Sequence, residues 1–137
     1  MALNLTVRVK AAINRDIITL DKDLSVKSAI KLMVHRNIGS VVITGERSRP
    51  IGIVTERDIL KSIAYRRTKP ETKVEEIMSE PLISVEANAT LGEAAEMMIK
   101  KKIRRLLVTQ NDKYIGIITQ RDLQRLMTDT FRSLLIM

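Results

Sequence analysis

Two stretches of the chain place apolar residues at positions i, i+3, i+4, i+7 and i+8, which is the spacing of an amphipathic helix. The apolar positions of the first stretch are Val26, Ala29, Ile30, Met33 and Val34. Those of the second, 65 residues later, are Leu91, Ala94, Ala95, Met98 and Ile99. Thr90 and Glu93 form a capping box, and Ser25 is a suitable N-cap for the first stretch. We therefore expect two equivalent helices that begin near Ser25 and Thr90.

Short apolar runs flank these two helices and predict strands. One run precedes each helix and two follow it, separated by a polar turn that is one residue longer in the first half, a change that a hairpin loop tolerates. The predicted strands are 17–20, 41–43 and 51–54, and then 82–85, 106–108 and 114–118. Each last strand leads into a second helical stripe. These stripes are Ile59, Leu60, Ile63 and Ala64, and then Leu123, Leu126, Met127, Phe131, Leu134 and Leu135.

The sequence therefore predicts an α/β (α+β) chain in which a strand–helix–strand–strand–helix unit occurs twice. A basic run ends at Pro70, which stops the preceding helix, so we assign residues 1–68 to the first repeat and 69–137 to the second. Single helical turns are expected at 72–78 and at 7–13. Because a unit of about sixty residues closes a core poorly alone, we expect the two repeats to pack against each other.

Composition narrows the class of protein. The chain of 137 residues is 45% hydrophobic, which suits a globular core. No apolar run approaches the ~20 residues of a membrane span, and no signal-peptide pattern opens the chain, so we expect a soluble, cytoplasmic protein. It has no cysteine and a single histidine, His35, which argues against disulfides and metal centres. No nucleophile–base pair or P-loop is present either, so we expect no enzyme and no required cofactor.

A net charge of +8 favours an anionic partner. Nucleic acid is one candidate, although the three aromatic residues Tyr65, Tyr114 and Phe131 are too few for a base-stacking platform. The exposed-looking run of Lys100, Lys101 and Lys102 is equally well explained as a solvated face.

One motif ends both repeats. Residues 52–58 read Gly-Ile-Val-Thr-Glu-Arg-Asp, and residues 116–122 read Gly-Ile-Ile-Thr-Gln-Arg-Asp. Each predicts a strand that runs straight into a helix, with a threonine at the junction and an aspartate three residues later. That spacing can be a helix cap alone. It can also bind a phosphate at the helix N-terminus and a sugar hydroxyl at the carboxylate.

The ordered set of motifs resembles a tandem pair of CBS domains, the repeat named after cystathionine β-synthase. In the first half the resemblance lies in Asp23-Leu24-Ser25, Ile38-Gly39-Ser40-Val41-Val42 and 52–58. In the second half it lies in Ile77-Met78-Ser79-Glu80-Pro81, Ile83-Ser84-Val85, Ala89-Thr90-Leu91, Arg104-Arg105-Leu106-Leu107-Val108 and 116–122. Together these segments cover nearly the whole chain.

The resemblance implies a stand-alone Bateman module, in which two repeats pack sheet to sheet with pseudo-twofold symmetry. Such modules bind adenosine-containing ligands, AMP, ADP, ATP or S-adenosylmethionine, in clefts between the repeats, and signal to another protein. We expect no fused effector domain, so the output is either a partner protein in trans or a role as a nucleotide reservoir. The family commonly forms homodimers, and the apolar positions Leu126, Phe131, Leu134 and Leu135 support a homodimer here.

The resemblance also implies roles for individual residues. Asp58 and Asp122 would accept ribose hydroxyls, Thr55 and Thr119 would hold a phosphate, and 17–20 and 82–85 would flank the adenine. Arg104 and Arg105 open a strand where the first half has Gly39 and Ser40, so we expect one cleft to prefer the more phosphorylated ligand. The candidate ligand-binding residues are Thr19, Gly39, Ser40, Thr55, Arg57, Asp58, Ile83, Ser84, Arg104, Arg105, Thr119, Arg121 and Asp122.

Overall fold

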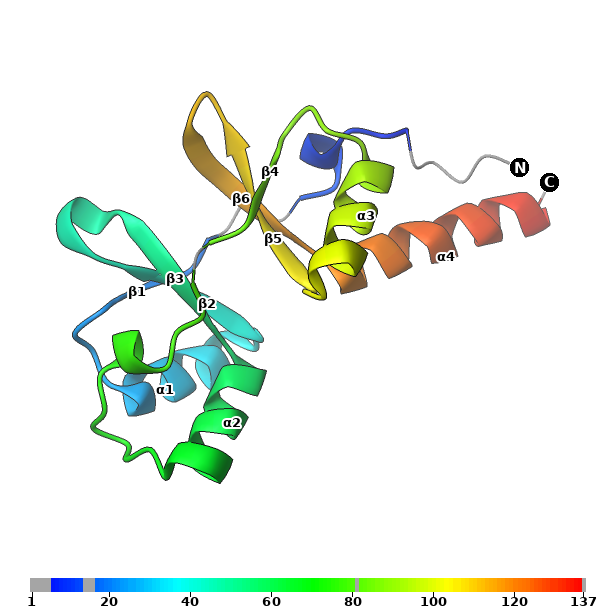
Figure 1. Cartoon of the computed structure of the whole chain (residues 1–137). Helices are drawn as coiled ribbons and strands as arrows, with labels where there is room; N and C mark the ends of the chain where they lie inside the picture. Colours follow the sequence, from blue (N-terminus) through cyan, green and yellow to red (C-terminus); the bar gives the residue numbers. More distant parts are fainter. Residues whose placement is uncertain (1–5, 14–16, 81, 137) are drawn as a thin grey trace. The chain divides into compact units, whose positions relative to one another are not determined.

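A computed structural model describes residues 6–13, 17–80 and 82–136 (Figure 1). The chain forms two compact units, one containing Ile17–Leu82 and the other containing Met1–Asp16 with Ile83–Met137. Each unit has one three-stranded sheet and two α-helices. This confirms the α/β (α+β) class and the repeated β-α-β-β-α order. The packing of the two sheets against each other stays a prediction.

The unit of residues 17–82 contains a sheet in the order β1-β2-β3. Strand β1 runs parallel to β2, and β3 runs antiparallel to β2. Alternate residues of the sheet, including Val41, Ile43 and Val54, are buried against both helices of the unit. The elements are β1 (Thr19–Asp21), α1 (Val26–Arg36), β2 (Ser40–Thr44), the 3-10 turn η2 (Glu46–Ser48), β3 (Pro50–Thr55), α2 (Glu56–Arg66) and the 3-10 turn η3 (Val74–Glu76).

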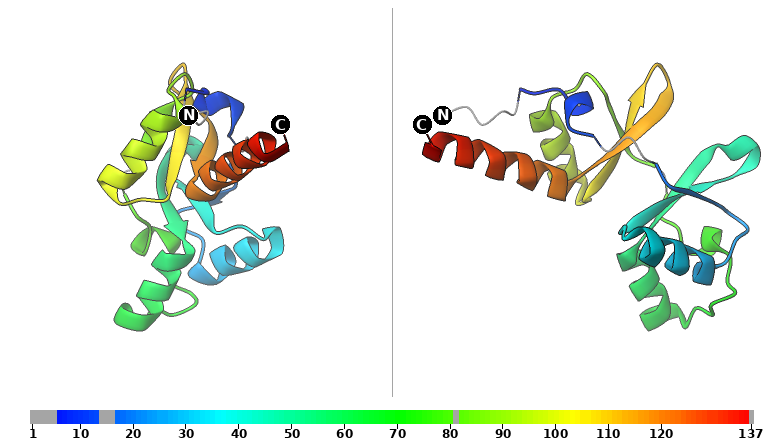
Figure 2. Two further views of the ribbon diagram at one scale, coloured as in Figure 1. Left: turned by 90° about the vertical axis from the view of Figure 1, so that its right-hand side faces the viewer. Right: turned by 180° about the vertical axis from the view of Figure 1, so that it is seen from behind.

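The second unit repeats this topology with a sheet in the order β4-β5-β6. Leu106, Val108 and Ile118 form its buried centre together with apolar residues of α3. Helix α4 is longer than α2 and projects beyond α3 (Figure 2). The elements are the 3-10 turn η1 (Val9–Ala11), β4 (Ser84–Glu86), α3 (Leu91–Lys101), β5 (Arg105–Gln110), β6 (Lys113–Thr119) and α4 (Gln120–Ile136).

Local signals place the helix starts where the sequence predicts them. The Ser25 hydroxyl accepts a hydrogen bond from the Ser28 backbone N–H at 3.1 Å and caps α1. Thr90 and Glu93 form the predicted reciprocal capping box of α3. None of the described helices is both long enough and apolar enough to cross a membrane.

The compact units do not coincide with the sequence halves 1–68 and 69–137. The segment after Pro70 stays with the first sheet, because Val26 N–H donates to Thr72 C=O at 2.7 Å and Val74 N–H donates to Leu24 C=O at 2.8 Å. In the same way, the N-terminal turn η1 pairs with the loop before α3, where Val9 N–H donates to Ala89 C=O at 2.8 Å. The turns η3 and η1 therefore each belong to the unit whose sheet comes from the other sequence half.

The stripe predicted for α2 is only partly buried. Ile59 and Ser62 face the core, whereas Leu60 is 68% exposed and Ile63 is 53% exposed. Val34 of α1 is 75% exposed as well. The helical period thus identifies the helix correctly but overestimates how much of its apolar surface one unit can bury.

Candidate functional site

The residues of the repeated motif lie at one edge of each sheet. Because β1 and β2 are parallel and β3 is antiparallel to them, the N-terminal ends of β1 and β2 meet the C-terminal end of β3. Ser40 lies opposite Thr55 in the register, and Glu56 N–H donates to Gly39 C=O at 3.1 Å. The start of β2 and the start of α2 are therefore neighbours, as the predicted site requires.

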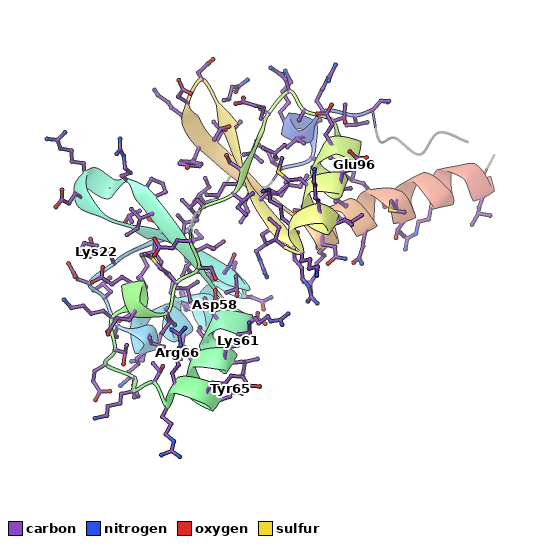
Figure 3. All side chains as sticks on the ribbon, in the orientation of Figure 1. Lys22, Asp58, Lys61, Tyr65, Arg66 and Glu96 are labelled. Carbon is purple, nitrogen blue, oxygen red and sulfur yellow. The ribbon has the colours of Figure 1, made fainter. Side chains whose placement is uncertain are left out.

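Thr55 and Asp58 form a reciprocal hydrogen-bonded pair at this edge. Asp58 Oδ2 accepts from Thr55 N–H at 2.9 Å and from Thr55 Oγ1 at 3.0 Å, and Asp58 N–H donates to Thr55 Oγ1 at 3.2 Å. This is a complete capping box, so the pair stabilises the start of α2 whether or not a ligand binds. Figure 3 shows Asp58 at the β3 end of α2, with Lys61 about one turn further along.

The second unit repeats the same geometry. Asp122 Oδ2 accepts from Thr119 N–H at 2.8 Å and from Thr119 Oγ1 at 2.9 Å. Arg105 lies opposite Thr119 in the register, and Gln120 N–H donates to Arg104 C=O at 2.8 Å. The strand edge of this unit thus combines the start of β5, the end of β6 and the start of α4.

The two aspartates differ in the donor that reaches their other oxygen. Asp58 Oδ1 accepts from the Ser79 hydroxyl at 2.8 Å, and Asp122 Oδ1 accepts from Arg125 Nη2 at 2.9 Å. Sequence reasoning assigned no role to Ser79 or Arg125. Arg125 could have been found by its i, i+3 spacing from Asp122, whereas Ser79 reaches Asp58 across 21 residues of chain and carries no local signal.

The predicted site residues of β1 and β4 lie along the same edges. Thr19 lies opposite Val42, two residues further along β2 than Ser40, and its side chain is exposed. In the other unit, the Ile83 C=O accepts from Leu107 N–H at 3.1 Å, and Ser84 lies opposite Leu107. Both backbones run beside the motif, and Thr19 and Ser84 hold equivalent positions, because Leu107 is two residues further along β5 than Arg105.

Cationic side chains are unevenly distributed between the two edges. The edge of β5 and α4 carries Arg104, Arg105, Arg121 and Arg125, and Arg105 already makes an interaction within the protein. The equivalent edge of β2 and α2 carries Arg57 and Lys61, both exposed, next to Gly39 and Ser40. The edge of the second unit is therefore the better suited of the two to a ligand with several negative charges.

Metal binding has no support from the part of the chain that the structure describes, because no group of three or more acidic, histidine or cysteine side chains there could hold an ion. The chemistry at both edges is that of hydrogen-bond acceptors, helix N-termini and cations. Such a set can bind a polar organic anion without a metal ion.

Comparisons with known proteins agree with this architecture. The family model of the CBS domain matches the chain at residues 9–65 and again at 74–129. An uncharacterized protein of Methanopyrus kandleri is 41% identical over 121 residues, which cover 86% of this chain and 61% of that protein. An uncharacterized protein of Methanocaldococcus jannaschii is 33% identical over 120 residues, covering 85% of this chain and 64% of that protein. The chain thus spans less than two thirds of the length of both relatives.

Solved structures show the same fold. A conserved protein of Pyrococcus horikoshii superimposes with a TM-score of 0.83 at 26% identity, covering 88% of this chain and 92% of that one. A CBS domain pair that was crystallised with 5′-methylthioadenosine and S-adenosyl-L-methionine has a TM-score of 0.81 at 27% identity, covering 90% and 98%. With two family matches that account for most of its length, the chain belongs to the CBS domain family and carries two CBS domains.

Proposed function

We propose that this chain is a regulatory module that binds adenosine-containing ligands at the two strand edges. The observation that carries the proposal is the repeated pair of Thr55 with Asp58 and Thr119 with Asp122, each at the same register position of its sheet. In each pair the helix cap occupies one carboxylate oxygen, and a side chain that can rotate away occupies the other. The structural neighbour crystallised with two adenosine derivatives supports this choice of ligand class.

Asp58 and Asp122 accept hydroxyls of the ribose in this proposal. Thr55 and Thr119, which stand at helix N-termini, contribute to a phosphate site together with backbone N–H groups. Arg57 and Arg121 follow in the first helical turn and add positive charge. The backbones at Thr19 and at Ile83 and Ser84 flank the adenine, and Gly39 and Ser40 line the first site next to the start of α2.

The ligands that fit best are AMP, ADP and ATP, bound as regulatory ligands rather than as cofactors of a reaction. We assign the more phosphorylated ligand to the edge with Arg104 and Arg105, because guanidinium groups bind phosphate through charge-assisted hydrogen bonds. S-adenosylmethionine and 5′-methylthioadenosine are the alternatives, and the neighbouring CBS pair supports them. The less cationic edge, next to Gly39 and Ser40, suits such unphosphorylated nucleosides.

In this proposal, ligand binding changes the activity of a separate partner protein. The chain acts as a homodimer. Adenine nucleotides are cytoplasmic metabolites, so the proposal places the module in that compartment. Nucleic-acid binding is the second candidate function, and it rests on the net charge of +8 and on the exposed Lys100, Lys101 and Lys102. The affinity for nucleic acid would fall steeply as the salt concentration rises, whereas the affinity for a nucleotide at the proposed site would change less.

Calorimetric titration of the protein with AMP, ATP, S-adenosylmethionine and 5′-methylthioadenosine tests the proposal. The variants Asp58→Asn and Asp122→Asn retain an acceptor for the helix cap but remove the charge that binds ribose. Glu96→Gln is the matched control, because Glu96 is an exposed carboxylate in the middle of α3 (Figure 3). We expect each aspartate variant to weaken one binding event. The proposal fails if the wild-type protein binds none of the four ligands.

A further inference from the structure

Ser79 is held in a fixed position beside the candidate site of the first unit. Its backbone N–H donates to Ile53 C=O at 2.8 Å, and its C=O accepts from Ile53 N–H at 3.1 Å. These two bonds form an isolated antiparallel bridge along β3. From this position the Ser79 hydroxyl reaches Asp58 Oδ1 at 2.8 Å. The contact therefore depends on a docked segment of backbone and not only on a surface rotamer.

Gly52 provides the space for this docking. A Cβ atom at Gly52 would lie 2.5 Å from Met78 Sδ and 3.0 Å from the Ser79 carbonyl oxygen. Both distances are shorter than ordinary van der Waals contact, so a side chain at position 52 would displace residues 78 and 79 from β3. The glycine of the repeated motif thus allows Ser79 to approach Asp58.

The Asp58 carboxylate has limited capacity for further donors. A carboxylate has about four lone-pair sites, two on each oxygen. The N–H and the hydroxyl of Thr55 occupy Oδ2, and the Ser79 hydroxyl occupies one of the two sites on Oδ1. One site is left. A vicinal diol such as that of ribose needs two acceptor sites to bind through both hydroxyls.

We infer that Ser79 is an internal competitor for the ribose diol at Asp58, and so a residue that sets the affinity of this site. The inference rests on the proposed function, since it assumes that Asp58 accepts ribose hydroxyls. A ligand that binds through both hydroxyls must displace the Ser79 hydroxyl from Oδ1. One hydroxyl then replaces another, and the affinity is reduced by the hydrogen bond that Ser79 loses.

Asp122 has a different competitor. Arg125 belongs to the same helix as Asp122, its side chain is 65% exposed, and it carries a charge. When a ligand displaces it, the guanidinium can pair with a phosphate of the same ligand. A displaced Ser79 hydroxyl offers no such charge. The residue equivalent to Ser79 in the first sequence half is Asn14, which lies outside the described residues.

The test isolates the Asp58 site in an Asp122→Asn background. AMP and its 2′,3′-dideoxy analogue are titrated calorimetrically into this variant, into the same variant with Ser79→Ala, and into the same variant with Ser79→Thr. We expect Ser79→Ala to raise the affinity for AMP by about threefold to tenfold, the equivalent of one ordinary hydrogen bond. Ser79→Thr retains the hydroxyl and should retain the affinity of the Asp122→Asn protein.

The dideoxy analogue separates competition from a structural effect. Because it lacks the diol, it does not compete for Asp58 Oδ1, and Ser79→Ala should leave its affinity unchanged. Equal AMP affinity with and without Ser79→Ala, or an equal change for both nucleotides, overturns the inference and leaves the proposed function intact. Binding of AMP to the wild-type protein but to none of the Asp122→Asn variants also overturns it, and confines binding to Asp122. If the wild-type protein binds neither AMP nor any of the other adenosine ligands, both proposals fail.

Discussion

Asp122 and Arg125 form an ion pair of 2.9 Å near the start of α4, on the carboxylate oxygen that the helix cap leaves free. Among the described residues, the equivalent pair of α2, Asp58 and Lys61, forms no ion pair, and Asp58 Oδ1 accepts from the Ser79 hydroxyl instead. Two sites with the same cap therefore present different charges to a ligand. The donor on this oxygen is a guanidinium at Asp122 and a neutral hydroxyl at Asp58.

Arg125→Gln should reduce the preference of the protein for ATP over adenosine. The variant removes a cation that can pair with phosphate, and it frees Asp122 Oδ1 for the ribose. We expect ATP affinity to fall about threefold to tenfold, as for the loss of one partly exposed charged contact, while adenosine affinity stays level or rises. Competition calorimetry measures both. Lys61→Gln, the equivalent change in the other unit, is the control, and equal losses in the two variants would contradict a specific role for Arg125.

Removing either capping carboxylate should cost stability independently of ligand. Asp58→Ala and Asp122→Ala each delete an acceptor of the Thr N–H and hydroxyl, and losses of this kind cost about 1 kcal/mol. The Asn variants should cost less, because the amide oxygen still accepts. Urea unfolding without ligand measures the difference. If the Ala and Asn variants unfold at the same urea concentration, the caps contribute little.

Local patterns predict the helices and the repeated motif because their contacts are local. Ser25, Thr90 and Thr55 cap helices through residues only three positions away, and the sequence displays that spacing directly. The sequence also identifies the unequal charge of the two edges, since Arg104 and Arg105 align with Gly39 and Ser40.

Contacts between distant segments could not be predicted in this way. Ser79 meets Asp58 only because residues 78 and 79 pair with β3, and no pattern in the sequence specifies that bridge. The exchange of 3-10 turns between sequence halves has the same origin, since it depends on backbone bonds such as that between Val74 and Leu24. The exposure of Leu60 and Ile63 likewise depends on how much surface one small unit can cover.

Gly52→Ala should destabilise the first unit. The added methyl group would meet Met78 Sδ at 2.5 Å and the Ser79 carbonyl oxygen at 3.0 Å, and overpacking of this kind costs about 1–3 kcal/mol. Met78→Ala in the same protein should recover part of the loss, because the closest contact is with that flexible side chain. Gly45→Ala is a matched control, since its Cβ would meet only the Ile51 side chain, no closer than 3.2 Å. Thermal unfolding that ranks Gly45→Ala as the more damaging change would contradict this account.

A surface ion-pair cluster should give the stability of the first unit a small dependence on acid pH. A hydrogen bond from Lys73, with further help from Lys22, lowers the pKa of Asp23 below its usual value. A carboxyl whose pKa is lowered by folding contributes stability above its unfolded pKa, and this contribution is lost as the pH falls through the folded pKa. Lys73→Gln should therefore raise the pKa of Asp23 toward its ordinary value, as measured by NMR titration of the carboxyl carbon. Added salt should also raise the pKa of Asp23 in the wild-type protein. If the pKa of Asp23 changes neither in Lys73→Gln nor with added salt, the ion pair does not form.

Exposed apolar side chains on two helices of the first unit predict self-association of the chain. Val34 on α1 and its equivalent Ile99 on α3 are 75% and 78% exposed. Leu60 on α2 is 68% exposed, whereas the equivalent position in α4 is the polar Gln124. The sequence placed the homodimer interface on α4 instead. There, Leu126 packs against the core of its own unit and Leu135 is exposed. The side chains of Phe131 and Leu134 lie outside the described part. Because Leu60 is apolar where the second unit has Gln124, we expect the homodimer interface to include α2 of the first unit.

Light scattering at tens of micromolar should give the mass of a dimer for the wild-type protein. Leu60→Glu places a charge on the exposed face of α2 and should shift the mass toward that of the monomer, because burying an unpaired carboxylate is costly. Gln124→Glu makes the equivalent change in the second unit and should leave the dimer intact if the first unit provides the interface. A monomeric wild-type protein would rule out self-association, and loss of the dimer only in Gln124→Glu would move the interface to α4.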